Sequence, residues 1–585
     1  MRERNYLSIA LIAAIGILSV SIFSEAAYAQ IKGSRELKTP IDTRTATVSS
    51  DLYGIRYFDW QTVVNNRFAI PGTEKAEFSS YGQPSVNSKG MVVFRARSTA
   101  GEHFSGIFMR PNMFRPVMVI ADPQTLVPYP NNLNTKFREF SAFPRIAMNT
   151  DLITMTGLHQ PVYKYSLPKG GEVAVGTTGI YVQFGTDLLV TAASKLGSVP
   201  GFDYYSVPSL KSVAFDVFPG AAAIADDGTV VFKGNYSLNG VSKTGVFVRE
   251  VLNTPGGGVS TVAMIANSDM DMPAIPMNMD FPTIKFDSTA PPTVAGDQAI
   301  FLGLDNEEAP TAGGIYLAQL KGETKLQNIV PIGEPLPGVH LPPLTRIGEA
   351  LAFDGRYVTF WAAWGKDTKA FRLYCPADGN RSIITYCNGS DPNSVFDKET
   401  GRWFQDKEVP LNQGIFIYDL LADTAYRVAD NQEDFDDFLF WVYSGKAPGA
   451  DKDADADAEP PRWRSSAFVA ASNGWVVFKA RNGDPSGEKE SVDGLYMSNP
   501  VVGDKTKVIA ETGMDGGFLD PGMSSYFRET LPITGLGIER DGFRGNMLAI
   551  TATMGNDEFS WGGIYLANVG DDRVGKTVSK PKTVK

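Results

Sequence analysis

Acidic and aromatic side chains gather in one stretch of this 585-residue chain, where they could bind a ligand. Three aspartates between positions 434 and 437 lie among phenylalanines, and a tryptophan follows them. Aromatic rings offer flat apolar faces and carboxylates accept hydrogen bonds, a combination that suits carbohydrate recognition. We therefore predict a ligand site formed by Trp403, Asp434, Asp436, Asp437 and Trp441. The competing interpretation is that these residues only cover the sheet beneath them.

A second acidic stretch has the alternation that calcium-binding loops use. Asp451, Asp453, Asp455 and Asp457 stand at every second residue. Calcium takes about six to eight oxygen ligands, and its loops supply carboxylates at alternate positions. Ala456 stands where such a loop has a glycine, so a disordered acidic linker is the competing interpretation. Calcium is the one cofactor that the sequence suggests.

Catalytic residues remain unknown at this stage. His103, His159 and His340 belong to different parts of the chain, and the sequence has no Gly-x-Ser-x-Gly turn or phosphate-binding glycine loop. A glycosidase needs only two carboxylates at a suitable separation. The loops that we expect on one face of the molecule carry Glu102, Asp305, Glu307, Glu308, Asp367, Asp484, Glu488, Glu490, Asp493, Asp557 and Glu558. Solvated loop charges are the competing interpretation.

The N-terminus and the cysteines indicate export. Two arginines precede an apolar run over residues 6–23, and Ala27-Tyr28-Ala29 then supplies a cleavage pattern, so we expect residues 1–29 to be a signal peptide. An uncleaved membrane anchor is the alternative. No later stretch is apolar enough to span a membrane, so we expect a secreted or periplasmic protein. In such a compartment Cys375 and Cys387 should form a disulfide rather than two buried thiols.

A repeated motif indicates which elements must position these residues. Glycine, an aliphatic residue, an aromatic and an apolar residue recur seven times, at Gly106–Met109, Gly179–Val182, Gly245–Val248, Gly314–Leu317, Gly414–Ile417, Gly494–Met497 and Gly563–Leu566. A strand-like run such as Gly90–Ala96 precedes each copy, and apolar runs such as Val117–Ala121 follow. Four short strands per unit predict an all-β fold, a seven-bladed β-propeller with four-stranded antiparallel blades. Solenoids and chains of sandwiches would leave edges that need cover.

The ends of the repeat array favour a closed ring. The seventh unit runs into a polar tail before a fourth strand, and Gln61–Gly72 matches Gln327–Gly338 from the end of the fourth unit. We therefore predict that an N-terminal strand within 58–72 completes blade 7. A long irregular insertion, Leu373–Gln413, interrupts the fifth unit. The expected organisation is a signal peptide (1–29), an N-terminal extension (30–57), a propeller (58–570) with blades starting near 77, 140, 213, 284, 346, 465 and 531, and a polar tail (571–585).

Asn87, followed by Gly90–Ala96 and then Gly106, resembles the Asn-x-x-Gly-x-x-x-Phe tandem repeats of exported, often surface-anchored bacterial proteins. The resemblance covers most of the mature chain, although the fifth and seventh units lack the asparagine. It implies a secreted, propeller-like repeat protein of undefined activity, and it brings no catalytic residues.

These observations together favour binding over catalysis. We predict an exported binding or scaffold protein, monomeric, for a carbohydrate, peptide or protein ligand. The alternative is a glycan-active hydrolase or lyase that uses carboxylates on the loop face of the propeller. A net charge of −11 argues against nucleic acid as a partner, because phosphates require a basic surface.

Overall fold

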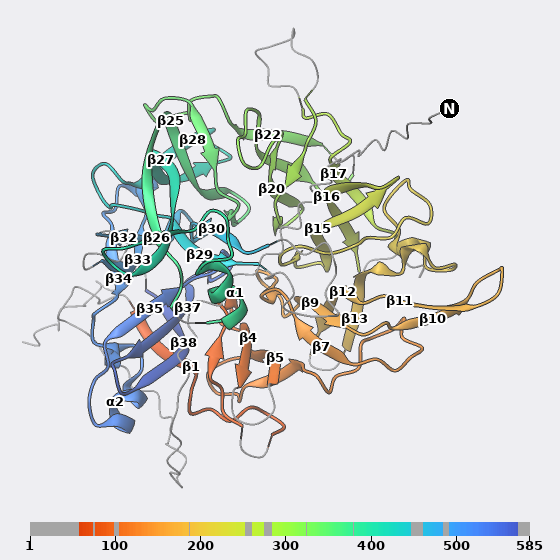
Figure 1. The fold of residues 1–585 in the computed structure, drawn as a ribbon, viewed down its shortest axis with the longest axis horizontal. Helices are drawn as coiled ribbons and strands as arrows, with labels where there is room; N and C mark the ends of the chain where they lie inside the picture. Colours follow the sequence, from red (N-terminus) through yellow and green to blue (C-terminus); the bar gives the residue numbers. More distant parts are fainter. Residues whose placement is uncertain are drawn as a thin grey trace, which may run out of the picture.

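The computed structural model describes residues 58–570, except 74–75, 99–103, 186–187, 252–259, 274–283, 323–324, 378, 446–459 and 484–490. Antiparallel sheets make up most of this part of the chain, which confirms the predicted all-β class. The sheets stand around a common centre, the arrangement of a β-propeller (Figure 1). Among the described residues no helix is long and apolar enough to cross a membrane.

Seven sheets of four or more strands follow one another along the described chain, and we number them in that order. Sheet 1 contains β2 (Ser80–Tyr81), β3 (Ser85–Val86), β4 (Val92–Ser98), β5 (Phe104–Arg110) and β6 (Met118–Ala121). Sheet 2 contains β7 (Phe137–Phe140), β8 (Arg145–Ile146), β9 (Ile153–His159), β12 (Thr178–Phe184) and β13 (Leu188–Ser194). Sheet 3 contains β14 (Ala223–Ile224), β15 (Thr229–Leu238), β16 (Val241–Glu250) and β17 (Ala263–Asn267). Sheet 4 contains β18 (Ser288–Thr289), β19 (Thr293–Ala295), β20 (Gln298–Leu304), β21 (Gly313–Gln319) and β22 (Leu326–Pro331).

The remaining sheets repeat this order. Sheet 5 contains β23 (Leu344–Ile347), β24 (Ala352–Phe353), β25 (Tyr357–Tyr374), β26 (Val395–Asp397), β27 (Arg402–Asp419) and β28 (Thr424–Asp430). Sheet 6 contains β31 (Val469–Ser472), β32 (Trp475–Asn482), β33 (Val492–Ser498) and β34 (Lys507–Glu511). Sheet 7 contains β35 (Ile533–Gly537), β36 (Phe543–Arg544), β37 (Met547–Gly555), β38 (Ser560–Val569) and β1 (Phe58–Asn65). Two hairpins, β10 (Tyr163–Ser166) with β11 (Glu172–Val175) and β29 (Phe440–Ser444) with β30 (Arg462–Ser466), stand outside these sheets. The short helices are α1 (Arg381–Cys387), α2 (Pro521–Phe527), η1 (Lys195–Ser198), η2 (Asp203–Tyr205), η4 (Pro500–Val502) and η5 (Gly516–Phe518).

The repeated glycine has a steric cause. A Cβ atom on Gly106 would lie 2.9 Å from the ring of Phe108 and 3.2 Å from the carbonyl oxygen of Ala121. The aromatic two residues later therefore folds over the glycine, beside the register shift that separates Ile107 from Phe108 in the pairing of β5 with β6. The aromatic ring then packs on its neighbour in the second strand, with the ring centres of Phe94 and Phe108 at 5.7 Å.

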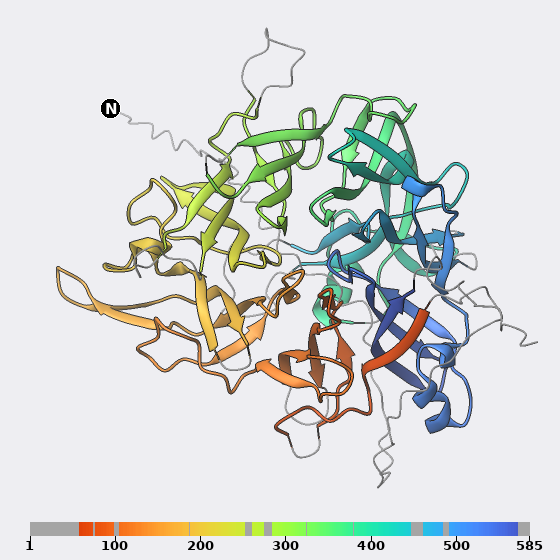
Figure 2. The ribbon, with the colours of Figure 1, turned by 180° about the vertical axis from the view of Figure 1, so that it is seen from behind.

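The innermost strands are in contact from sheet to sheet. β3 contacts β8, and the series continues through β14, β19, β24, β31 and β36, which contacts β3 again. β1 pairs antiparallel with β38, from Phe58 opposite Val569 to Asn65 opposite Gly563. Apolar side chains fill the spaces between neighbouring sheets, as where Phe94 of sheet 1 packs with Ile564 of sheet 7. Figure 2 shows the same ring from behind.

The insertion expected over Leu373–Gln413 is more ordered than its sequence pattern predicts. β25 and β27 remain paired as far as Tyr374 opposite Phe404, so only the residues between them lack a long strand. Lys366, Asp367 and Thr368 face solvent, whereas Phe371 and Val409 are buried. Buried and exposed residues follow one another in β27 without strict alternation, so the sequence there lacks the two-residue period of a strand.

Candidate functional site

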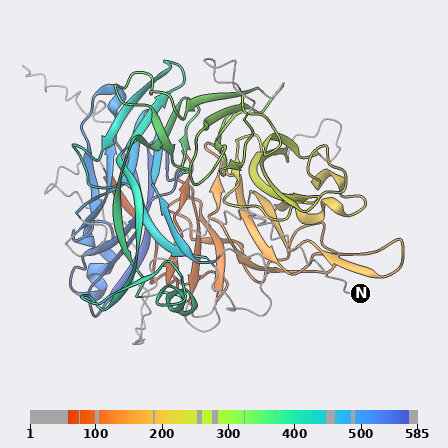
Figure 3. The same cartoon turned by 45° about the horizontal axis from the view of Figure 1, so that its top comes forward.

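Two insertions form a cap over one face of the ring. The first is the connection between β25 and β27, and the second is the hairpin β29–β30; we call the described residues of 375–404 and 440–466 the cap. Cys375, Cys387 and Tyr443 form a small core with Trp403 and Trp463 packed against it. In Figure 1 α1 and the hairpin project onto the middle of the ring, and in the tilted view of Figure 3 α1 lies at the lower margin of the sheets. The cap therefore stands on the face that Figure 1 presents.

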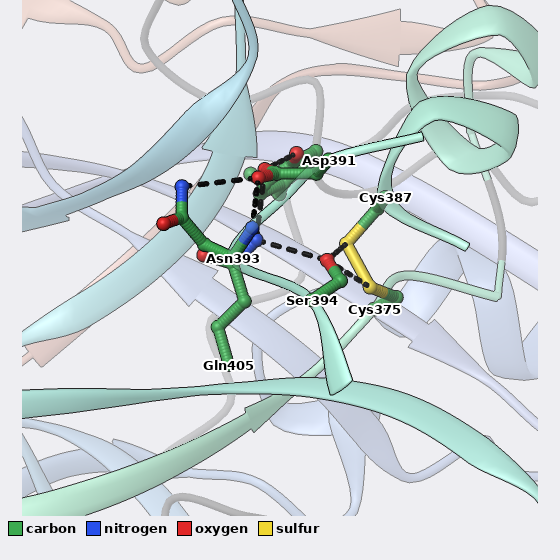
Figure 4. The surroundings of a disulfide bond; sticks show 7 residues. Cys375, Cys387, Asp391, Asn393, Ser394 and Gln405 are labelled. Atoms are coloured by element: carbon green, nitrogen blue, oxygen red, sulfur yellow. Dashed lines mark hydrogen bonds between the residues drawn. A yellow bond between two sulfur atoms is a disulfide. The ribbon is translucent and has the colours of Figure 1, made fainter. Parts of the chain in front are cut away.

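A disulfide and a buried carboxylate hold the cap together (Figure 4). Cys375 and Cys387 are bonded with their Cα atoms 5.8 Å apart, which confirms the predicted pairing. The hydroxyl of Tyr443 and, at 2.8 Å, the amide of Gln405 donate to Oδ2 of Asp391, joining the two insertions. Burial alone would raise the pKa of Asp391, but the donors, Tyr443 first, lower it. The carboxylate is thus ionised and fully engaged in holding the cap.

A second ionic group occupies the centre of the ring. Arg145 of sheet 2 contacts Oδ2 of Asp541 in sheet 7 at 2.5 Å and donates to the carbonyl of Pro292 in sheet 4 at 2.8 Å. Arg544 also donates to Asp541. Because sheets 2, 4 and 7 are not neighbours, these contacts must cross the axis. Burial would raise the pKa of Asp541, but Arg145 and Arg544 outweigh it and lower the pKa to about 2. We call Arg145, Asp541 and Arg544 the axial ion cluster.

A further group of charges lies between the axis and the cap. Lys233 of β15 and Arg540, just after β35, are 3% and 6% exposed. Glu307 lies between β20 and β21 and is partly buried, whereas Glu349, between β23 and β24, is exposed. Arg462 of the cap is 3.5 Å from Glu308. We call Lys233, Glu307, Glu349, Arg462 and Arg540 the convergent charge cluster.

The charged groups of this cluster shift one another's pKa values. Burial lowers the pKa of Lys233, and the carboxylates of Glu349 and Glu307 oppose that shift. Burial, and then the charge of Glu349, raise the pKa of Glu307, while Lys233 and Arg462 lower it less strongly. Shifted ionisable groups of this kind concentrate at functional sites. The cluster therefore brings two carboxylates and three cationic groups from four sheets and the cap to one place.

The predicted ligand residues are dispersed. Asp437 is fully buried and accepts from the backbone N–H of Phe438 and Leu439, at 2.9 and 3.1 Å. Asp436 accepts from the N–H of Gly483, and Asp434 from that of Asp430. These carboxylates thus fasten turns.

The two tryptophans predicted to bind a ligand pack in different cores. Trp403 packs beside the disulfide in the cap. Trp441 packs on the core between sheets 5 and 6, where its indole N–H has no partner among the described residues. Asp451, Asp453, Asp455 and Asp457 lie outside the described residues, as do residues 1–29. Within the described residues no group of three or more His, Cys, Asp or Glu side chains could hold a metal ion.

Sequence reasoning singled out Glu307 but missed its neighbours. Lys233 directly follows the apolar run Val230–Phe232, and a charge at such a position was the available indication. Glu349 and Arg540 lie where the innermost strands of sheets 5 and 7 are interrupted, and the sequence has no pattern that reports such interruptions. His159 is buried and pairs through Nε2 with the hydroxyl of Tyr181 at 2.6 Å, away from this cluster.

No family model matches the chain, and no curated protein matches it. Among solved structures the chain is similar to the β-propeller domain of the Trilobed protease from Pyrococcus furiosus, at 9% identity and a TM-score of 0.36, covering 83% of this chain and 96% of that one. It is also similar to an acylaminoacyl peptidase from Pyrococcus horikoshii, at 11% identity and a TM-score of 0.34, covering 86% and 53%. The Nup133 β-propeller domain of Vanderwaltozyma polyspora matches at 8% identity and a TM-score of 0.26, covering 85% and 100%. At these levels similarity does not extend to function.

Proposed function

We propose that the chain is a closed, seven-bladed propeller in which β1 completes the last blade. The unbroken series of contacts among the innermost strands supports this, as does the pairing of β1 with β38. Closure removes the free sheet edges that an open array would have. A closed ring also gives the cap and the convergent charge cluster a fixed frame.

Within this frame the protein is an exported binding protein whose ligand contacts the convergent charge cluster beside the cap. The observation that carries this proposal is the convergence of Lys233, Glu307 and Glu349 from three different sheets. The pKa values of Lys233 and Glu307 are both shifted, and ionisable groups with shifted pKa values concentrate at functional sites, which favours a binding role. The disulfide in the cap supports an oxidising compartment.

The mixture of charges favours a peptide or protein segment over a carbohydrate. Ammonium and guanidinium groups can pair with the carboxylates of a peptide, while Glu307 and Glu349 can pair with its cationic groups. The axial ion cluster closes the centre beneath, so the ligand would approach from the side of the cap.

The test is a screen of the mature protein against a displayed peptide library, with a glycan array in parallel. Lys233→Met and Glu349→Gln should weaken binding of a selected peptide by at least about tenfold, the effect of losing one charge-assisted contact. Lys321→Met is the control, because Lys321 pairs with Asp227 and Asp297 at exposed positions outside the cluster. Selected peptides that bind all three variants equally would refute this site.

A second candidate function rests on Glu307. Its raised pKa, caused by burial and by Glu349, is what a general acid of a glycoside hydrolase requires. Release of new reducing ends from a polysaccharide panel, abolished in Glu307→Gln, would establish the hydrolase. Binding without turnover would favour the binding protein.

A further inference from the structure

A cavity of about 410 Å³ lies between sheets 6 and 7, apart from the convergent charge cluster. It is lined by the start of β1, the first residues of β32, the segment that follows β33, and the end of β38. Those segments stand at the ends of strands where the first strand of a sheet leads to the second and the third strand adjoins the fourth, opposite the connection between second and third strands that carries the cap. Cavities of roughly 300–1,000 Å³ are the size that small ligands occupy.

The cavity combines an apolar floor with an aromatic wall. Phe58, Met497 and Phe543 line it and are 6%, 1% and 1% exposed. Trp475 also lines it and is partly exposed, and Nζ of Lys507 lies over its ring, 5.2 Å from the ring centre. The part of the indole that Lys507 leaves open, beside an apolar floor, is a surface on which a flat, weakly polar ring can lie.

One polar side chain in the lining has an unmet hydrogen-bonding group. Asn499 is 5% exposed, and its Oδ1 has no hydrogen-bond partner in the part of the chain that the structure describes. Asn499 stands at the N-cap of η4, yet its side chain makes no capping hydrogen bond. A buried acceptor without a donor is unfavourable and rare in folded proteins. Oδ1 of Asn499 is therefore an acceptor that a ligand in the cavity could satisfy.

We propose that this cavity binds a neutral saccharide unit of one or two pyranose rings. The apolar C–H face of a pyranose would lie on Trp475, and a hydroxyl would donate to Oδ1 of Asn499. A lipid chain would leave Oδ1 unpaired, and an anion would meet both Oδ1 and the carboxylate of Asp504 in the lining. Lys507 and Asp504 place one charge of each sign in that lining, so the lining favours neither an anion nor a cation.

The test uses the full mature chain and saturation-transfer difference NMR. The probes are the methyl glycosides of glucose, galactose, mannose and N-acetylglucosamine, together with maltose and cellobiose. At least one probe should bind, and its affinity should fall roughly tenfold in Asn499→Leu, the effect of losing one hydrogen bond. The melting temperature of Asn499→Leu should be unchanged or higher, because the replacement removes an unpaired buried oxygen.

Trp475→Ala should also weaken binding, whereas Trp463→Ala, in the cap, should leave it unchanged. Three outcomes would overturn the proposal: no probe binds, binding survives both Asn499→Leu and Trp475→Ala, or binding is lost in Lys233→Met instead. The last outcome would move the saccharide to the convergent charge cluster. Failure of the peptide screen leaves this result unaffected, so the two proposals can fail independently.

Discussion

A charged residue follows the aromatic of the second strand in three of the seven sheets. Arg95 follows Phe94, Lys233 follows Phe232 and Lys479 follows Phe478. Arg95 donates to the carbonyl of Phe140 in the next sheet at 2.8 Å. Lys479 lies 3.9 Å from the ring centre of Phe440 and 3.6 Å from Asp493. The same repeat position therefore carries a cation in three sheets, with different neighbours in each.

Because of Lys479, the free energy of unfolding should change with pH in the alkaline range. Burial lowers the pKa of its ammonium to about 8, and Asp493 opposes that shift. Between about pH 8 and 10.4 the unfolded chain holds this proton and the folded chain does not, so folding becomes more favourable as pH rises. Lys479→Met should therefore raise the free energy of unfolding at pH 7 by about 1–3 kcal/mol, allowing for the lost contact with Phe440.

Urea unfolding at pH 7 and pH 10 measures this effect. The difference between the variant and the parent should shrink at pH 10, because the lysine of the parent is then largely neutral. Lys243→Met is the control: Lys243 pairs with Asp269, whose side chain is 46% exposed, so the change should stay within about 1 kcal/mol. A destabilised Lys479→Met protein at pH 7 would show that the ion pair outweighs the desolvation cost.

Local contacts of this kind were partly predictable. Asn87 begins the Asn-x-x-Gly pattern, and its Oδ1 accepts from the N–H of Lys89 and Met91, so the repeated asparagine closes a turn. Asp354 does the same for Arg356 and Tyr357 in the fifth unit, which lacks the asparagine. Sequence could not predict the pairing of Arg145 with Asp541. These residues are 396 positions apart, and only the assembled ring brings them together.

At the scale of elements, the strands that carry the glycine motif were predictable and the cap was not. Each motif lies in the third strand of its sheet because glycine, aliphatic and aromatic residues recur in one order. The innermost strand of sheet 6 is interrupted by the hairpin β29–β30, since Asp437 already pairs with Arg481 before the hairpin begins. No local sequence pattern indicates that the residues before and after such a hairpin belong to the same strand position of the sheet.

Removing the disulfide should loosen the cap while leaving the ring intact. The bond closes a separation of 12 residues, which contributes about 3 kcal/mol in the loop-entropy model. α1 has only seven residues, too few to be stable alone. In a Cys375→Ser, Cys387→Ser variant, hydrogen exchange in α1 and in β29–β30 should therefore quicken by up to about 100-fold.

Exchange in β33, which lies outside the cap, is the internal control and should not change. The melting temperature should fall little, because the cap core is separate from the cores between the sheets. Unchanged protection of α1 would mean that the contacts of Asp391 hold the cap without the disulfide. Loss of protection throughout the chain would mean that the cap and the ring unfold together.

For the whole molecule, we expect stability to depend most on the axial ion cluster and on the packing of β1 beside β38. The axial ion cluster joins sheets 2, 4 and 7, and Arg544 extends it to the carbonyl of Ala471 in sheet 6. Where β1 pairs with β38, Phe58 and Trp60 of β1 pack in the core between sheets 6 and 7. Val63 and Val64 pack between sheets 7 and 1. One strand thus belongs to two of the interfaces on which a closed ring depends.

Deleting residues 30–72 should therefore cost far more than the loss of one edge strand. Besides its pairing with β38, β1 supplies Asn65, whose amide donates to the buried carboxylate of Asp520 at 2.9 Å. The deletion removes the buried side chains of Phe58, Trp60, Val63 and Val64, whose burial contributes about 1.5–3 kcal/mol each. A change of 1 kcal/mol shifts the melting temperature of a large domain by roughly 2–4 °C. We expect the melting temperature to fall by more than about 10 °C, or the protein to aggregate through the exposed edge of β38. Calorimetry on this variant and on one lacking residues 571–585, which should melt like the parent, makes the comparison. If both variants melt like the parent, β1 is not the strand that closes the ring.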